Sequence, residues 1–504
     1  MGAKPAGPLW LLIALQAAIS GASLVVEIVA GRMIAPYVGM SLYTWTAIIA
    51  VVLAGFSVGH WWGGRIAARP TDRALAYAGW TMIAAALTTG AAALVLRAVA
   101  GPLLQAVTEP LTAITLLATA AFFLPSLFAG VPAPILAVAA MRGRDEAERA
   151  LGAMFAAGAV GAIAGTLLAG FVFVSWLGSA TTLGAMTATY ALAAALFFRL
   201  AAARPREAGA AAAGALAALG LGLSTLALAP VCDRESRYFC IRTVALSDDP
   251  ADPVRLMVLD HLAHGIGARE APRVMFTEHT AMLDALPRMR LSPPFSSFHI
   301  GGGSYSVPRA WAERGLGEIT VAEIDPAVTA QAVADFWFDP ASAHVLHRDA
   351  RAALRDDPAR YDVILGDAFT DIAVPAHLVT EEFFRLVADR LTPRGLYAMN
   401  VVDTTDRMAA LAALVTTLRA VFPSVEVWTE ARPPGPAERR VFVILAGQSD
   451  SPVSRIETRA PAPTAFAALE PAFLDALVDR LAPPVLTDDF APIDRLVGLT
   501  RLVD

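Results

Sequence analysis

Residues 296–304 read SSFHIGGGS, and this stretch decides the fold of the second half of the chain. Residues 296–300 predict a strand, and the three glycines that follow let the backbone approach a ligand closely before a helix begins near Ser304. The stretch lacks the lysine of a phosphate-binding loop and the GxGxxG spacing of a dinucleotide site. A nucleoside without phosphates therefore fits this loop better than a nucleoside triphosphate or a dinucleotide.

Acidic residues lie at the ends of three predicted strands that follow the glycines. The strands are residues 318–324, with Glu323 near the end, residues 344–347, followed by Asp349, and residues 361–365, followed by Asp367. Strands that alternate with helices predict a parallel sheet with helices on both faces. An acid about 20 residues after the glycine loop is placed to hold a ribose diol. The simpler alternative is that the glycines form only a tight turn and the acids cap helices.

The remaining strand signals complete an α/β Rossmann-like domain. Residues 237–246 and 254–259 predict a small N-terminal β-hairpin, residues 395–401 a fifth strand, and residues 425–428 and 441–445 a closing antiparallel pair. We therefore predict three parts: a transmembrane domain at 1–231, a β-hairpin subdomain at 232–270 and a nucleoside-binding α/β domain at 271–504.

The first half of the chain has the composition of a membrane protein. Charged residues make up 17% of the 504 residues, mean hydropathy is +0.55, and residues 33–64, 74–96, 110–141 and 150–198 carry no charge. About 20 apolar residues cross a bilayer as a helix. We predict seven spans at 8–30, 42–63, 74–98, 109–130, 147–174, 178–199 and 208–230. Pro125, Pro132 and Pro134 predict a broken or re-entrant helix after the fourth span.

Charge and cysteine placement bear on orientation. The basic connections near residues 65–73, 142–149 and 199–206 predict cytoplasmic loops, so seven spans would place the second half outside the cytoplasm. Cys232 and Cys240 are the only cysteines, and they indicate either one disulfide in an oxidising compartment or two unrelated thiols. Supply of a cytoplasmic nucleoside argues for the other side, but the charge bias and the two cysteines favour the extracytoplasmic side for the second half of what we expect to be a multi-pass inner-membrane protein. The net charge of −6 disfavours nucleic acid as a partner.

Several segments resemble those of a known family. They are ESRY at 235–238, MVLD at 257–260, HIGGG at 299–303, AEID at 322–325, RDA at 348–350, YDVILGDAF at 361–369, VPAHL at 374–378 and LTDDFAP at 486–492. Residues 233–400 resemble spermidine synthases, and the whole chain resembles the membrane-fused spermidine-synthase-like proteins of bacteria. The resemblance implies a methyltransferase-type fold, a role in polyamine biosynthesis, and S-adenosylmethionine or its decarboxylated form as co-substrate.

The resemblance also implies roles for single residues. Those that would bind the co-substrate are Gly301, Gly303, Glu323, Asp349 and Ala350. Glu323 would hold the ribose hydroxyls and Asp349 would contact the adenine. Asp367 would accept the proton of the attacking amine, and Asp371 could bind a second ammonium. No metal is expected, because a carbon beside a sulfonium is already activated.

The chain departs from the family on the amine side. Ser304 stands where the family has an acid, and His261 and His264 stand where it has glycine and glutamine. The family's tyrosine–histidine pair is replaced around His279 and Thr280. The nucleoside half of the site is kept better than the amine half.

Three functions are consistent with these patterns. The first is aminopropyl transfer from decarboxylated S-adenosylmethionine to a small or lipid-associated amine. The second is transfer of another group, such as methyl, from S-adenosylmethionine to a membrane-associated acceptor. The third is a non-catalytic, transporter-like protein with a nucleoside-sensing domain. The sequence leaves the acceptor open, and it leaves homo-oligomerisation open.

Overall fold

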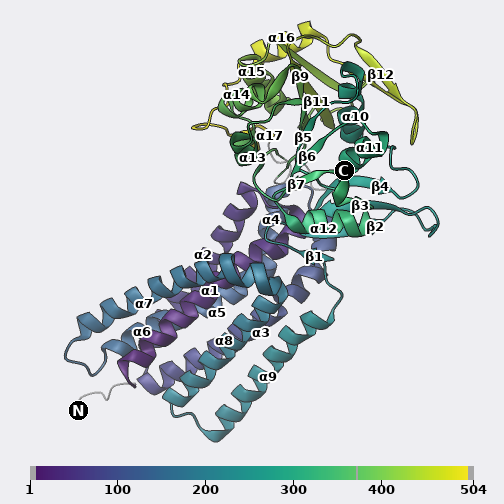
Figure 1. Ribbon diagram of the computed structural model, residues 1–504. Helices are drawn as coiled ribbons and strands as arrows, with labels where there is room; N and C mark the ends of the chain where they lie inside the picture. The colour runs from purple at the N-terminus through teal and green to yellow at the C-terminus, as the bar shows by residue number, and fades with distance from the viewer. Residues whose placement is uncertain (1–6, 370–372, 498–504) are drawn as a thin grey trace. The chain divides into compact units, whose positions relative to one another are not determined.

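A computed structural model describes residues 7–369 and 373–497 of the chain. The chain divides into two compact units, the first ending at Arg237 and the second beginning at Tyr238. The first unit is almost entirely helical, and the second combines helices with strands (Figure 1). The three-part division predicted from the sequence stays a prediction.

Long apolar runs form the helices of the first unit. The elements are α1 (Leu9–Val38), α2 (Leu42–Ala67), α3 (Thr71–Ala106), α4 (Pro110–Ala118), the π-helix η1 (Thr119–Phe123), α5 (Leu124–Gly130), α6 (Pro132–Met141), α7 (Ala147–Leu168), the π-helix η2 (Ala169–Leu177), α8 (Gly178–Leu200) and α9 (Pro205–Ala227). A two-residue strand, β1 (Arg234–Glu235), ends the unit.

Six helical runs in the described part of the chain are long and apolar enough to cross a membrane. The predicted count of seven spans is therefore not confirmed. One run, Ala147–Leu200, has 54 residues. At 1.5 Å per residue it would measure about 81 Å, more than twice the roughly 30 Å apolar core of a bilayer. Gly178, the first residue of α8, has a φ of 75°, which a continuous helix does not contain, so the backbone turns at the junction of η2 and α8.

Prolines and glycines shape the packing within this unit. The stretch with Pro125 and Pro132 belongs to one 32-residue helical run, Pro110–Met141, in which a π-helical segment precedes the prolines. Helices α1 and α7 pack backbone to backbone, because a Cβ added at Gly161 or Gly165 would collide with the carbonyl of Ala17 or Gly21.

The second unit begins with a small antiparallel sheet. Strand β2 (Cys240–Ala245) pairs with β3 (Val254–Leu259), which pairs with β4 (Leu262–Ala268). Cys232 and Cys240 are both disulfide-bonded.

A nine-stranded mixed sheet follows. Its order is β12-β13-β10-β11-β9-β8-β5-β6-β7. The strands are β5 (Ser297–Ile300), β6 (Ile319–Ala322), β7 (His344–Leu346), β8 (Tyr361–Gly366), β9 (Leu391–Thr404), β10 (Ser424–Glu430), β11 (Arg439–Gly447), β12 (Arg455–Thr458) and β13 (Thr464–Ala468). Strands β5 to β9 pair in parallel, and β9 to β13 pair antiparallel. This confirms the predicted α/β class, and β12 and β13 are additional to the prediction.

Helices cover both faces of this sheet (Figure 1). They are α10 (Glu278–Arg290), α11 (Ser306–Arg314), α12 (Pro326–Asp335), α13 (Ala350–Asp356), α14 (Glu381–Asp389), α15 (Ala409–Arg419), α16 (Pro471–Leu481) and α17 (Ile493–Val497), with 3-10 turns η3 (Pro340–Ser342) and η4 (Ala376–Leu378). Ile364 packs in the core formed with α13 to α17, whereas Val363 and Leu365 pack in the core formed with α10 to α12. Both faces are buried because side chains alternate along each strand.

Candidate active site

The glycine loop turns sharply at the end of β5. Gly301 and Gly303 have φ values of 89° and 51°, which glycine adopts at low cost. A Cβ at Gly301 would lie 2.6 Å from the carbonyl oxygen of Asp367, so the loop and the end of β8 touch only because Gly301 has no side chain. Helix α11 begins at Ser306, two residues later than predicted, because Tyr305 is also left-handed, with a φ of 55°.

Glu323 holds this loop to the end of β6. Its Oε2 accepts a hydrogen bond of 2.8 Å from the Gly302 N–H, and its Oε1 accepts one of 2.9 Å from the Asp325 N–H. The side chain is buried, and this burial raises the pKa of Glu323 against the opposing effect of the backbone donors. A carboxylate has about four acceptor positions, so these two bonds leave capacity for the two hydroxyls of a ribose.

Asp349 lies one strand further along the same sheet edge, after β7. It caps α13, accepting 2.8 Å from the Ala352 N–H, and its Oδ2 lies 2.8 Å from Nε2 of His377. Burial would raise the pKa of Asp349, but the bonds from Ala352 and His377 bring it below its ordinary value. The alternative in which Asp349 only caps a helix therefore accounts for one of its two carboxylate oxygens. The other oxygen contacts the imidazole of His377, which the sequence did not identify as a site residue. Ala350, the first residue of α13, is buried.

Asp367 lies beside the glycine loop, on the other side of β5 from Glu323. Its N–H donates 2.9 Å to the Ile300 carbonyl, and its Oδ1 accepts 3.0 Å from Nδ2 of Asn400 on β9. The Oδ2 lies 3.9 Å from Nε2 of His279 at the start of α10. The amide of Asn400 therefore fixes one oxygen of Asp367 and leaves the other toward His279.

An unpaired amide oxygen and a small cavity border this carboxylate. The Oδ1 of Asn400 is buried and has no hydrogen-bond partner in the described chain. Unpaired buried acceptors are uncommon in folded proteins, and they point to a missing donor. A cavity of about 20 Å³, room for about one water, lies between Asp367, Gly302, Ser304 and Thr280.

A group of histidines surrounds the same cavity. His264, which is half-buried, and His299, which is buried, line it. Loss of solvent around the ring lowers the pKa of His264 to about 4, with His279 and His261 contributing, and burial lowers the pKa of His299 to about 3. These imidazoles are therefore uncharged at neutral pH. From the sequence alone, His261 and His264 were interpreted only as departures from the family pattern. His279 was interpreted as part of the replacement of the family's tyrosine–histidine pair. Tertiary structure instead brings His279 to Asp367.

The VPAHL segment at 374–378 and the LTDDFAP segment at 486–492 meet beside Asp349. Arg351 of α13 forms a bidentate ion pair with Asp488 at 2.7 and 2.6 Å, and it also donates 3.1 Å to the His377 carbonyl. Thr380 donates 2.7 Å to the same carboxylate. The VPAHL and LTDDFAP segments are therefore tied to each other and to α13, which positions the imidazole of His377 against Asp349.

The structure thus gathers most of the predicted site. Gly301, Gly303, Glu323 and Asp367 meet at the ends of β5, β6 and β8, with Asp349 one strand away. Asp371 lies outside the described residues. No group of three or more His, Cys, Asp or Glu side chains able to hold a metal occurs in the described chain, and the metal-free expectation stays a prediction.

The chain is similar in sequence to known transferases. A probable polyamine aminopropyl transferase of Bifidobacterium longum is 33% identical over 130 residues, which cover 26% of this chain and 29% of the relative. An N-terminal histidine N-methyltransferase of Emericella nidulans is 28% identical over 205 residues, covering 39% of this chain and 34% of the relative. No family model matches the chain.

Two further relatives, from Vibrio vulnificus and Leptospira biflexa, are named polyamine aminopropyltransferase, like the Bifidobacterium relative, so most of these relatives are transferases of that kind. A probable spermidine synthase from Corynebacterium glutamicum aligns in structure with 51% of this chain and 96% of its own, at 18% identity and a TM-score of 0.42. The chain spans only about a third of the length of the first two relatives, so the reaction of the whole protein is a matter for proposal.

Proposed function

We propose that the chain is a membrane-bound transferase that moves an aminopropyl group from decarboxylated S-adenosylmethionine to an amine acceptor. One observation carries the proposal: the backbone of the glycine loop links Glu323 on one side to Asp367 on the other. A nucleoside held by its ribose at Glu323 would present its sulfur substituents toward Asp367. The six apolar helical runs support membrane attachment, and the extracytoplasmic side for the second unit remains part of the proposal.

The residues fit such a co-substrate. Glu323 keeps free acceptor positions for the ribose hydroxyls, and Asp349 with Ala350 would border the adenine. The acceptor nitrogen forms a bond to the carbon beside the sulfonium, the carbon–sulfur bond breaks, and a neutral thioether leaves. The proton released by the nitrogen goes to Asp367, whose orientation Asn400 fixes. In this proposal the unpaired Oδ1 of Asn400 is an acceptor for the incoming ammonium or amine.

Methyl transfer from S-adenosylmethionine is the second candidate, because one relative is named as an N-methyltransferase. The same contacts to the nucleoside would bind both donors, because the two donor molecules differ only beyond the sulfur atom. Among the described residues, Asp367 is the only carboxylate that lines this cavity, and the histidines that line it, His264 and His299, are uncharged at neutral pH. An acceptor with a single amine therefore fits the described residues as well as a diamine.

The test uses the full-length chain purified in detergent. Each donor is incubated with a panel of mono- and diamines, and mass spectrometry identifies both the modified amine and the thioether by-product. Aminopropylated product that disappears in Asp367→Asn supports the proposal. Methylated product with the carboxylated donor alone would select the second candidate, and binding of neither donor would overturn both.

A further inference from the structure

A large cavity, open on one side, lies among the helices of the first unit. Its volume is about 530 Å³, within the range of small-molecule sites, and 18 residues of α1, α2, α5, α6 and α7 line it. Most are apolar or small, among them Phe56, Val138 and Met154. One water molecule has a share of roughly 30 Å³ in the liquid, and we take the same volume for each non-hydrogen group of a ligand. The cavity volume then corresponds to about 18 such groups. That is the size of one long hydrocarbon chain with a small head.

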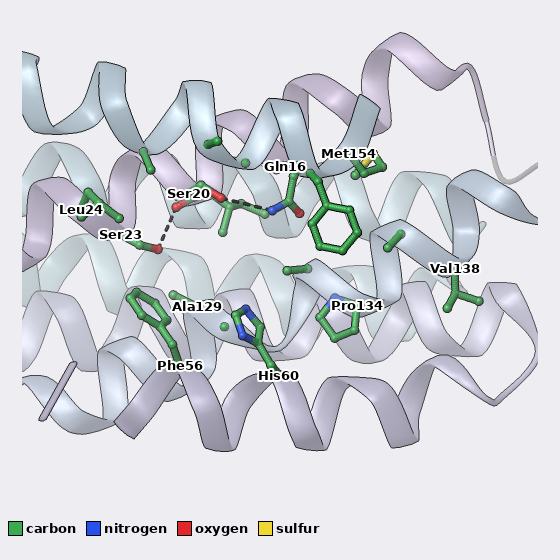
Figure 2. A pocket seen from close by; sticks show the side chains of 18 residues that line it. Gln16, Ser20, Ser23, Leu24, Phe56, His60, Ala129, Pro134, Val138 and Met154 are labelled. Atoms are coloured by element: carbon green, nitrogen blue, oxygen red, sulfur yellow. Dashed lines mark hydrogen bonds between the residues drawn. The ribbon is translucent and has the colours of Figure 1, made fainter. Parts of the chain in front are cut away.

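Polar side chains interrupt this apolar lining. Figure 2 shows Gln16, Ser20 and Ser23 along α1, and His60 on the facing wall from α2. Gln16 donates 3.2 Å to Ser20, which leaves its second N–H and its carbonyl oxygen available. His60 stacks on Phe56 with ring centroids 6.3 Å apart and forms no hydrogen bond with any described residue. No lining residue carries a formal charge at neutral pH.

Helix geometry places these groups at one depth. Gln16 lies seven residues after the start of α1, and His60 seven residues before the end of α2, which is about 10 Å along each helix. The two helices are joined by residues 39–41 and run in opposite directions, so both positions lie the same distance from the same end of the unit. In a bilayer this depth has no water to satisfy an amide and an imidazole.

We propose that this cavity binds a neutral bilayer amphiphile with one long hydrocarbon chain and a hydroxyl or carbonyl head, the head contacting Gln16, Ser20 and His60. The apolar walls accept the chain. The uncharged polar groups accept and donate hydrogen bonds to the head, and a charged head would be left there without a counter-charge. An ordinary acyl chain would leave the same polar groups unsatisfied. The proposal rests on the membrane placement proposed above and is independent of the transfer reaction.

The experiment uses the full-length protein in lipid nanodiscs with three photoreactive diazirine probes: hexadecanol, hexadecane and an acyl-labelled phosphatidylcholine. Peptide mass spectrometry locates the crosslinks. We expect hexadecanol to label the lining of α1, α2 and α7 at least fivefold more than hexadecane. Equal labelling by hexadecane or by phosphatidylcholine would overturn the proposal. A protein that does not enter nanodiscs refutes the membrane placement instead.

Two matched variants sharpen the test. Ala162→Leu fills the cavity from α7, whereas Ala156→Leu makes the same change at an exposed position of α7 outside it. Hexadecanol labelling should fall severalfold in the first and be unchanged in the second. The double variant Gln16→Leu with His60→Phe keeps the cavity's shape and should reduce hexadecanol labelling to the hexadecane level. Retained preference for the alcohol in this variant contradicts the assignment, even where Ala162→Leu fails to fold.

Discussion

Replacing Asp367 by asparagine tests the proposed proton acceptor with little change in shape. The Asp367 Oδ1 that accepts from Asn400 is also present in an asparagine, so the 3.0 Å bond is retained. The oxygen facing His279 becomes an NH₂ group, which cannot accept a proton. Glu323 and the glycine loop keep their contacts, so donor binding should be unchanged.

The expected loss is in turnover. A positioned general base contributes about 10²–10⁴-fold, which corresponds to about 2.7–5.4 kcal/mol in activation free energy. Donor affinity measured by calorimetry should stay within about twofold of the native value. The kcat measured by mass spectrometry should fall about 10²–10⁴-fold. Asp389→Asn, an exposed change on α14, is the matched control and should leave kcat unchanged. Full turnover in Asp367→Asn would refute the assigned role, and a parallel loss of donor binding would make Asp367 a binding residue.

Three other outcomes are expected. Glu323→Ala should weaken donor binding about tenfold or more, by calorimetry, and should lower the free energy of unfolding because it leaves two backbone donors without their acceptor; unchanged affinity would remove Glu323 from the site. Because the folded-state pKa of Asp349 lies below its ordinary value, the stability difference between the native chain and Asp349→Asn should be present at neutral pH and disappear as pH falls through about 4 and below; a pH-independent difference in melting temperature would contradict stabilisation of the ionised Asp349 carboxylate by its hydrogen bonds. Thiol labelling of intact cells should leave Cys232 and Cys240 unmodified until reductant is added, after which an impermeant reagent should label both; labelling only after permeabilisation would place the second unit in the cytoplasm.

Sequence alone identified the residues to which we assign the co-substrate half of the proposed site. The run of glycines, the acids at 323, 349 and 367 and the strand pattern are local signals, and each strand that was predicted lies within a few residues of its observed bounds. Strand β9 extends beyond its predicted ends. Strands β4, β12 and β13 were missed because short, mixed-polarity segments gain their order only by pairing: β4 with β3, β13 with β10 and β12 with β13. Apolar length likewise identified the helical unit, whereas the division of Ala147–Leu200 depends on the backbone at Gly178.

Tertiary structure decided the contacts between residues far apart in the chain. His279 and Asp367 are 88 residues apart, and Arg351 and Asp488 are 137 apart. No local pattern encodes such pairs, because the order of strands in the sheet and the packing of helices on it determine which strand ends become neighbours. The same holds for Gln16 and His60, which share a cavity only because their helices run in opposite directions and leave space between them. Sequence therefore determined which chemical groups are available, and packing determined which of them meet.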